Sequence, residues 1–510
     1  MSRKISVPIP SGGLVVDKPA EFIDIRSIAS CQNIQIDRNI VQKRLGGIVL
    51  GSALGERILS QFELESGINT YFVRVGPTKA QVINKTTLAW TSIANSVLTA
   101  TENDQVSFAF PLISNVKYVV YTNAVDNIRK YYGTGNDADL GGSPPKCQFV
   151  LDFKGYLVLA YVIDGGTTYS ARVQWSDTGD PETWTGGNSG STNLLEDSSD
   201  ITGLSRFGDY ICVHKENSIY IGQLVSTSDI FRFTRRETSG CIANGSIQNL
   251  PDGTQIYLSR DGIRLFNGVT SVLIPSSIID ELRDSMNPKW VKRATSVLVK
   301  DLDEYWVGIP IGSQTEPETI YKYNYKTGNV YKDSRSGLMS LALYKRVASD
   351  TWDDATGDWD SDTDRWDSVT ELELHRQVVC GHDDGLSILR SSTNNDNDVA
   401  IDSIWETKDF TIADIDTERD IGNLVRWKGL DIWSLGNSVS VYYSTDSGNN
   451  WYLIGSISLS SDYPGDDSPD ILYFDVLSSK IRFRFRNNTA SESWSLKQYV
   501  LWYSVRENRK

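Results

Sequence analysis

Groups that commonly carry out enzymatic chemistry are scarce in this 510-residue sequence. Histidine, the side chain that most often exchanges protons near neutral pH, occurs only three times, at His214, His375 and His382. Cys380 and His382 form a conceivable dyad, but no glycine-rich oxyanion loop or nucleophile elbow accompanies them, so we interpret both as strand residues. No glycine-rich loop precedes a convincing helix, which disfavours a phosphate-binding site. The sequence therefore predicts a protein that is not an enzyme.

Cysteine is sparse as well. The five cysteines are widely separated, odd in number and without a C-x-x-C pair, which argues against a zinc site and against a disulfide framework. Such usage is typical of a chain made in a reducing cytoplasm. The first residues contain no apolar stretch of signal-peptide length, and the longest apolar run, 156–163, is too short for a bilayer. We expect neither secretion nor membrane insertion.

Positive charge is in the minority, with 50 Lys and Arg against 65 Asp and Glu and a formal net charge of −15. A protein that holds nucleic acid tightly needs a concentrated positive surface, because its binding energy comes largely from the phosphates. The charge therefore argues against tight binding of nucleic acid. It allows DNA as a neighbour, since an acidic wall favours passage of DNA over binding.

Strand-forming aromatic residues and turn-forming glycines are plentiful, with 14 Trp, 24 Tyr, 15 Phe and 40 Gly. Short alternating apolar segments, separated by polar turns, recur between residues 56 and 393. Hairpins of this kind return about every 40 to 50 residues, so we predict a β-propeller of six or seven blades. A helical pattern at 277–285 is expected between two blades. The clearest apolar segments are 69–75, 117–121, 155–159, 209–213, 255–258 and 304–309.

The segments on either side of this repeat complete an all-β prediction. Residues 1–55 are expected to form an extended N-terminal arm and entry strand, in which Asp17 caps one helical turn containing Pro19 and Glu21. A polar stretch at 394–398 is expected to be a linker. Residues 394–510 alternate with period two, which predicts a C-terminal β-sandwich after the propeller of residues 56–393. Three arginines there alternate with three apolar residues: Arg482, Arg484 and Arg486 with Ile481, Phe483 and Phe485.

Two short motifs resemble the Asp-box hairpin of sialidases and other propellers. In 444–451 the Asp446 carboxylate can accept turn N–H groups, Gly448 supplies an unusual backbone angle, and Trp451 packs beneath. A looser version contains Asp177 and Trp184. We interpret both motifs as structural turns, because the motif itself carries no catalysis.

Three Trp-Asp pairs recur at steps of seven residues, at Trp352, Trp359 and Trp366. Side chains on one face of a strand are an even number of residues apart, so this step fits three turn-linked repeats better than one strand. Tryptophan in a polar surrounding is typical of an interface anchor, and we predict that these residues dock a partner.

A calcium site is the alternative for the same stretch. Asp358, Asp360, Asp362 and Asp364 alternate as oxygen ligands do in a calcium loop, although the Gly and the distant Glu of an EF-hand are absent. Calcium is the only cofactor that the sequence suggests, and we favour the docking interpretation over it.

The Trp-Asp repeat, the turn at 175–184 and the entry segment together resemble tail hub or nozzle proteins of short-tailed bacteriophages, also called packaged-DNA stabilisation proteins. The likeness extends along most of the chain. In the entry segment it rests on Ser11-Gly12-Gly13, on Asp17-Lys18-Pro19-Ala20-Glu21 and on Cys31-Gln32-Asn33.

The resemblance implies a propeller protomer that forms a homo-oligomeric ring, usually six-fold, below the portal and adaptor proteins and near tail fibre or needle proteins. Such a ring extends the DNA channel, retains the packaged genome and mediates its ejection without specific DNA contacts. It also implies synthesis in the host cytoplasm and a final location in the virion tail. The alternative is a carbohydrate-binding adhesin or tail-fibre attachment protein. A sialidase-like hydrolase is disfavoured, because there is only one good Asp box.

Overall fold

The computed structural model describes residues 3–7, 12–37, 40–67, 69–225, 230–346, 376–414, 422–458 and 469–505. The described chain is almost entirely β-structure. Its helix α1 (Ile279–Ser285) lies between the fifth and sixth propeller sheets, as the pattern at 277–285 predicted. None of the described helices has the length and apolar character needed to cross a membrane. The short 3-10 segments are η1 (Asn244–Ser246), η2 (Val291–Arg293), η3 (Lys300–Leu302) and η4 (Ile412–Asp414).

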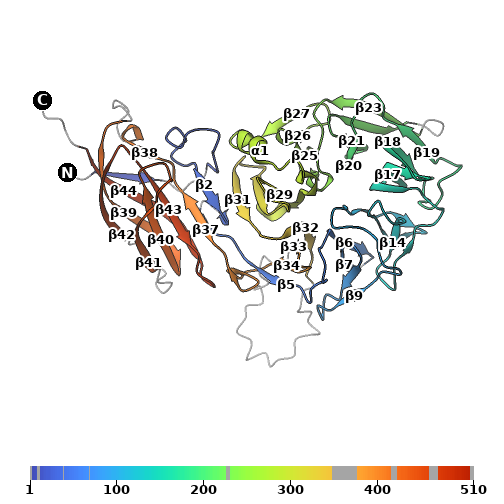
Figure 1. Cartoon of the computed structure of the whole chain (residues 1–510), viewed down its shortest axis with the longest axis horizontal. Coiled ribbons are helices and arrows are strands. Elements are labelled where there is room, and N and C mark those ends of the chain that lie inside the picture. Colours follow the sequence, from blue (N-terminus) through green and yellow to red (C-terminus); the bar gives the residue numbers. More distant parts are fainter. Residues whose placement is uncertain are drawn as a thin grey trace.

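Six four-stranded antiparallel sheets follow one another along the chain and surround a common centre (Figure 1). The first contains β6 (Ser60–Ser66), β7 (Asn69–Val75), β8 (Ala80–Ile83) and β9 (Trp90–Ser92). The second contains β10 (Ser107–Ala109), β13 (Val119–Thr122), β14 (Arg129–Tyr131) and β15 (Ala138–Asp139), beside a small hairpin of β11 (Leu112–Ile113) and β12 (Val116–Lys117). The third contains β16 (Lys146–Phe153), β17 (Tyr156–Asp164), β18 (Thr167–Trp175) and β19 (Gly190–Asn193).

The next three sheets repeat the same order. The fourth contains β20 (Ile201–Phe207), β21 (Tyr210–Lys215), β22 (Ile219–Leu224) and β23 (Phe231–Glu237). The fifth contains β24 (Gln248–Asn249), β25 (Gln255–Ser259), β26 (Gly262–Phe266) and β27 (Ser271–Ile274). The sixth contains β28 (Thr295–Val299), β29 (Glu304–Ile309), β30 (Thr319–Asn324) and β31 (Val330–Ser334). This architecture confirms the prediction of an all-β chain built on a β-propeller.

A seventh sheet closes the ring with a strand from the N-terminal segment. Its order is β32 (Leu338–Tyr344), β33 (Gln377–His382), β34 (Ser387–Arg390), β5 (Gly47–Val49), β35 (Asn395–Asp396) and β36 (Val399–Ala400). The closing strand fits only because it begins with glycines. A Cβ atom at Gly46 would lie 2.0 Å from the carbonyl oxygen of Asn395, and one at Gly47 would lie 2.5 Å from Ile388 Cγ2.

The remaining strands form two six-stranded sheets beside the ring (Figure 1). One has the order β3 (Ile34–Asp37), β4 (Ile40–Lys43), β44 (Trp494–Val505), β39 (Val425–Gly436) and β42 (Asp470–Ser478), with β1 (Arg3–Val7) also paired to β44. The other has the order β2 (Ser30–Gln32), β37 (Ser403–Glu406), β43 (Lys480–Asn487), β40 (Ser438–Ser444) and β41 (Tyr452–Ser458), with β38 (Phe410–Thr411) also paired to β43. Both sheets contribute to one hydrophobic core that contains Trp405, Trp427, Phe483, Phe485 and Leu501.

The alternation predicted for β43 has a clear structural basis. Its apolar residues Ile481, Phe483 and Phe485 are fully buried. Its arginines lie on the opposite face and pair with carboxylates from 402–409. These ion pairs are Arg482 with Asp409, Arg484 with Glu406 and Arg486 with Asp402, at 2.7, 2.5 and 2.8 Å.

Strand pairing crosses both of the predicted domain boundaries, near residue 55 and near residue 394. Within 1–55, β1, β2 and β4 pair with C-terminal strands and β3 pairs with β4, whereas β5 belongs to the seventh propeller sheet. Beyond 393, β35 and β36 continue that same sheet. The polar stretch at 394–398 is therefore a part of a sheet rather than a free linker.

The helical turn expected after Asp17 is absent, and this prediction was wrong. Residues 17–23 form turns and bends. The Asp17 carboxylate instead accepts a hydrogen bond of 2.9 Å from the backbone N–H of Ile279, at the start of α1. Two more contacts hold the segment in place. The backbone N–H of Asp409 donates a hydrogen bond to the carbonyl of Ala20 (3.1 Å), and Lys480 forms an ion pair with Glu21 (2.5 Å). These contacts with distant elements replace a local helix.

The entry segment joins the ring to the two C-terminal sheets at β31. This strand is the outermost of the sixth sheet but is largely buried, unlike the exposed outer strands β9 and β15. The N–H of Leu14 donates to the carbonyl of Val330 (2.8 Å), and the N–H of Asn33 donates to that of Lys332 (3.0 Å). We call this region, centred on β31 and residues 12–44, the joint.

A buried ionic cluster fixes the joint. Asp333 of β31 lies 2.5 Å from Lys322 Nζ and 3.6 Å from Arg44 Nε. Asp396 of β35 binds the guanidinium of Arg44 and lies 3.4 Å from Arg335 Nη1. Burial acts to raise the pKa of Asp396, but the guanidinium groups of Arg335 and Arg44 outweigh it and hold that pKa well below its usual range.

Replacing Asp396 with Asn should destabilise the fold. The substitution removes the carboxylate that the buried Arg335 and Arg44 share and leaves Arg44 with Asp333 at 3.6 Å, so the free energy of unfolding at pH 7 should fall by about 3 kcal/mol. Because the folded-state pKa is depressed, the contribution of Asp396 is complete above its unfolded pKa of about 3.9 and is lost as the pH falls further. Chemical denaturation at pH 7 and pH 3 should therefore show a difference between wild type and D396N that shrinks at the lower pH.

The exposed Arg283–Asp280 pair of α1, with its N–O distance of 3.0 Å, provides the control. D280N should change the free energy of unfolding by less than about 0.5 kcal/mol. An equal effect of D280N and D396N would contradict the importance of the buried cluster.

Candidate functional site

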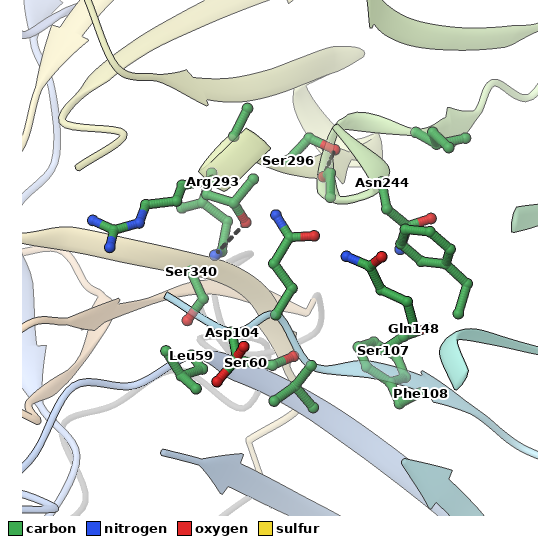
Figure 2. A pocket seen from close by; sticks show the side chains of 18 of the residues that line it. Leu59, Ser60, Asp104, Ser107, Phe108, Gln148, Asn244, Arg293, Ser296 and Ser340 are labelled. Carbon is green, nitrogen blue, oxygen red and sulfur yellow. Dashed lines mark hydrogen bonds between the residues drawn. The ribbon is translucent and has the colours of Figure 1, made fainter. Parts of the chain in front are cut away.

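The centre of the ring holds a cavity of 330 Å³. The strand that opens each propeller sheet contributes to its wall, from β6 in the first sheet to β32 in the seventh. Figure 2 shows side chains from separate strands directed toward this space, including Ser60, Ser107, Gln148, Ser296 and Ser340. Because each sheet supplies only a few residues, the cavity is assembled from the whole length of the propeller.

The wall of this axial cavity combines apolar side chains, such as Leu59, Phe108 and Met339, with polar ones that are mostly uncharged. Among the residues that line it, only Glu102, Asp104 and Arg293 carry charge. Arg293 is already saturated: its guanidinium lies 2.9 Å from the Glu316 carboxylate and donates to the Asn103 side chain at 2.7 Å. The other polar lining groups are amides and hydroxyls, among them Gln61, Gln105, Gln148, Asn244, Gln248, Ser60, Ser107, Ser205, Ser296 and Ser340.

One segment between the first and second sheets borders the cavity and reaches across to the sixth sheet. The side chain of Gln105 donates to the carbonyl of Lys292, and Arg57 Nε lies 3.4 Å from the Glu102 carboxylate. The same Arg57 pairs with Glu316 at 2.8 Å. These contacts fix residues 102–105 against η2, so the segment is a fixed part of the cavity wall.

The cavity volume limits what it can hold. A space of 330 Å³ lies at the lower end of the range for small-molecule sites. It suits a small polar molecule that hydrogen-bonds to amides and hydroxyls, and it is far too small for a DNA duplex.

Buried histidine and cysteine side chains do not supply a reactive centre in the described part of the chain. His214 and Cys212 are adjacent on one face of β21, with 3.2 Å between Nε2 and Sγ, and both are fully buried. Burial lowers the pKa of His214 to about 4 and raises the pKa of the Cys212 thiol. Burial likewise raises the pKa of Cys380 and lowers the pKa of His382. The neutral thiols are poor nucleophiles at neutral pH.

Sequence analysis missed the contact between Cys212 and His214. Their spacing of two residues on a strand was the signal that could have found it. The contact between Cys212 and His214 has a structural role. The imidazole of His214 is held by the side-chain oxygen of Gln255, which lies 2.7 Å from Nε2.

The turn around Asp446 has the geometry of a stapled hairpin. The Asp446 carboxylate accepts hydrogen bonds from the Ser444 hydroxyl (2.7 Å) and from the backbone N–H of Asn450 (2.9 Å). The Asn450 hydrogen bond and the Ser444 hydroxyl lower the pKa of Asp446 to about 2. Gly448 has a φ of +92°, and the guanidinium of Arg484 lies 3.9 Å from the centre of the Trp451 ring.

The second turn is held in a related way. The Asp177 carboxylate accepts hydrogen bonds from the backbone N–H groups of Thr178 and Asn188, both at 2.8 Å. Trp184 is buried in the core shared by the second and third sheets. The two turns lie in different parts of the chain and do not form a common site.

The other predicted site residues lie outside the described residues. These are the interface candidates Trp352, Trp359 and Trp366 and the calcium candidates Asp358, Asp360, Asp362 and Asp364. Within the described ranges, no three His, Cys, Asp or Glu side chains converge as a metal site would require.

No protein-family model matches the chain, and no curated protein matches it. Solved structures of β-propeller proteins do. The extracellular domain of the putative hybrid two-component system BT3049 from B. thetaiotaomicron is 10% identical with a TM-score of 0.42, over 92% of this chain and 62% of that one. BamB from Moraxella catarrhalis is 11% identical with a TM-score of 0.32, over 65% and 96%.

Raptor from Chaetomium thermophilum is 10% identical with a TM-score of 0.40, over 68% of this chain. The match spans only 29% of the Raptor chain and 62% of the BT3049 domain, so it covers a part of each.

The burial of His214 predicts that its ring stays neutral well below neutral pH. Its C–H signal in an NMR titration, identified by its loss in H214Q, should not shift between about pH 8 and pH 5, because its pKa is about 4 instead of about 6.5. Between those two values the unfolded state binds more protons than the folded state, so the free energy of unfolding should fall as the pH falls. A midpoint near pH 6.5 in the titration would contradict the described packing.

Proposed function

We propose that this chain is a virion structural protein, a tail hub or nozzle subunit of a short-tailed bacteriophage, and not an enzyme. Copies of the chain form a ring around a DNA channel, retain the packaged DNA and mediate its ejection. In this proposal each subunit is a seven-bladed propeller with a C-terminal β-sandwich, and the N-terminal segment binds the two together.

The observation that carries the proposal is the position of the entry-segment residues on which the family resemblance rests. Gly13, Asp17 and Asn33 all lie in the joint between the ring and the C-terminal sheets. Gly13 has a φ of +69°, and a Cβ atom there would lie 2.9 Å from the backbone nitrogen of Val330. Asp17 caps α1. The residues that carry the resemblance therefore contact both β31 and α1 in the joint, and this supports the proposal.

Of these three residues, Asn33 makes the most side-chain hydrogen bonds. It adopts the left-handed backbone conformation, with a φ of +54°, that Asn tolerates better than most residues. Its side-chain oxygen accepts from Arg44 Nε (2.9 Å) and from the N–H of Ser334 (3.0 Å), and its side-chain nitrogen donates to the carbonyl of Asp402 (2.9 Å). A joint tied by so many buried bonds suits a subunit that stays rigid under the pressure of packaged DNA.

The charge of −15 supports a channel through which DNA passes without specific binding. Since the axial cavity excludes a duplex, the proposed channel is bounded by neighbouring subunits in a six-fold ring. The portal and adaptor proteins lie above this ring, and tail fibre or needle proteins contact it. The chain is made in the host cytoplasm and ends in the virion tail, and Trp352, Trp359 and Trp366 are its proposed docking residues.

A carbohydrate-binding adhesin or tail-fibre attachment protein is the second candidate. The observation in its favour is the amide and hydroxyl wall of the axial cavity, whose groups could hydrogen-bond to a sugar. A glycan array distinguishes the two functions, because specific binding of a glycan at micromolar concentration would favour the adhesin.

The decisive experiment is electron microscopy of the purified chain mixed with its neighbouring tail proteins. We expect a closed ring of copies at the adaptor end, with DNA density in the central channel of virions. W352A/W359A/W366A should reduce incorporation of the chain, whereas substitution of the exposed Val269 by Ala provides a control that should not. A chain that never joins a particle, or one that hydrolyses a fluorogenic sialoside, would refute the proposal.

A further inference from the structure

The strand β42 has an open edge. It is the last strand of its sheet, paired with β39 on one side and with no strand on the other in the described part of the chain. It is nine residues long and lies among the C-terminal strands, away from the centre of the ring (Figure 1). Apart from a bulge in its ladder with β39 between Tyr473 and Val476, an edge of this length offers unpaired N–H and C=O groups to another strand.

The outer face of β42 carries an exposed apolar patch. Ile471, Tyr473 and Leu477 are 42%, 68% and 60% exposed, and we call these three residues the β42 patch. The ring of Tyr473 contacts that of Trp502 on β44, with 5.7 Å between centroids. Contiguous exposed apolar side chains on a soluble protein mark a surface that another molecule covers.

The inner face of the same strand is incompletely covered. Leu472, Phe474 and Val476 point toward the core but remain half-buried, whereas Leu430 and Trp427 on the neighbouring β39 are fully buried. Phe474 stacks on Tyr443 with ring centroids 6.0 Å apart. The hydrophobic core is therefore open at this edge, and one additional strand would cover it.

The sequence of β42 is complementary to itself. Antiparallel pairing of two copies about a two-fold axis at Phe474 places Ile471 opposite Leu477 and Leu472 opposite Val476. A shift by two residues in either direction places Asp475 opposite Ile471 or opposite the other Asp475. Of these three registers, only the one centred on Phe474 pairs apolar residues on both faces without placing Asp475 opposite Ile471 or the other Asp475.

The one charge on the patch is already compensated. Asp475 lies between Tyr473 and Leu477 on the outer face and accepts a hydrogen bond of 2.6 Å from Arg426 Nε. In the register centred on Phe474, each Asp475 faces the Tyr473 of the other copy, whose hydroxyl is a donor. Two copies can therefore approach without opposing carboxylates.

We propose that β42 is a self-association edge, through which two copies of the chain pair antiparallel and join their β39–β42 sheets into one. A second copy is the occupant because the matching pattern is present on β42 itself. A two-fold contact differs from the head-to-tail contact that closes a ring, so this pairing goes beyond the proposed function and does not depend on it.

Sedimentation equilibrium of the full chain tests the pairing. At about 50 µM, where a micromolar contact is populated, we expect a species of twice the 56.9 kDa chain mass. I471K/L477K places like charges opposite each other and should raise the dissociation constant at least about 10-fold. I471E/L477K places each Glu opposite a Lys in the Phe474 register and should restore pairing to within about threefold of wild type.

The matched control substitutes two exposed apolar residues of the propeller, Leu112 and Val269, which are 57% and 63% exposed. L112K/V269K should leave the dissociation constant unchanged, and circular dichroism should show that all variants are folded. A monomeric wild-type chain, or a dimer that I471K/L477K leaves intact, would overturn the proposal. So would a dimer that I471E/L477K fails to restore. Ring formation with tail proteins is measured separately, so loss of either assembly can be distinguished from loss of the other.

Discussion

The structure depends on the burial of one asparagine and the ionic cluster beside it. Asn33 bonds to β31, to Arg44 and to the segment before β37, and so connects the ring, the entry segment and the C-terminal sheets through one side chain. Arg44 then links Asp333 of the sixth sheet to Asp396 of the seventh. Buried charges are costly unless each finds a partner, so this cluster forms only when all three parts are in place. The joint therefore makes closure of the ring and assembly of the C-terminal sheets interdependent.

The parts of the fold that could be predicted from the sequence are those whose pattern is local. The six apolar segments noted in the sequence contribute the second strands of the first six propeller sheets, β7, β13, β17, β21, β25 and β29. A second strand lies inside its sheet and is buried on both faces, as β25 and β29 are throughout, so it stands out as an apolar run. Outer strands such as β9 and β15 are short and exposed, and their sequences resemble loops.

Features that depend on distant partners could not be predicted. The strand that closes the ring, β5, has three residues, and its glycines are explained only by the approach of Asn395 and Ile388. Asp17 does cap a helix, but that helix is α1, far away in the sequence. Asp396 resembles a linker residue until Arg44 and Arg335 are placed beside it. The axial cavity could not be predicted from the sequence either, because each sheet supplies only a few of its polar side chains.

The edges of the sheets differ in length and in what covers them. The ring has no open end, because β5 joins its first and last sheets, and the outer strands β9, β15 and β19 are short. β31 is covered by the entry segment, as the hydrogen bonds of Leu14 and Asn33 show. Soluble proteins shorten or cover edges in these ways to avoid unwanted pairing. The outer strands β23 and β41 are each seven residues long and also keep one unpaired side in the described part of the chain. β42 is longer, with nine residues, and the core beside it stays open, so the proposed pairing would cover both an edge and a part of the core.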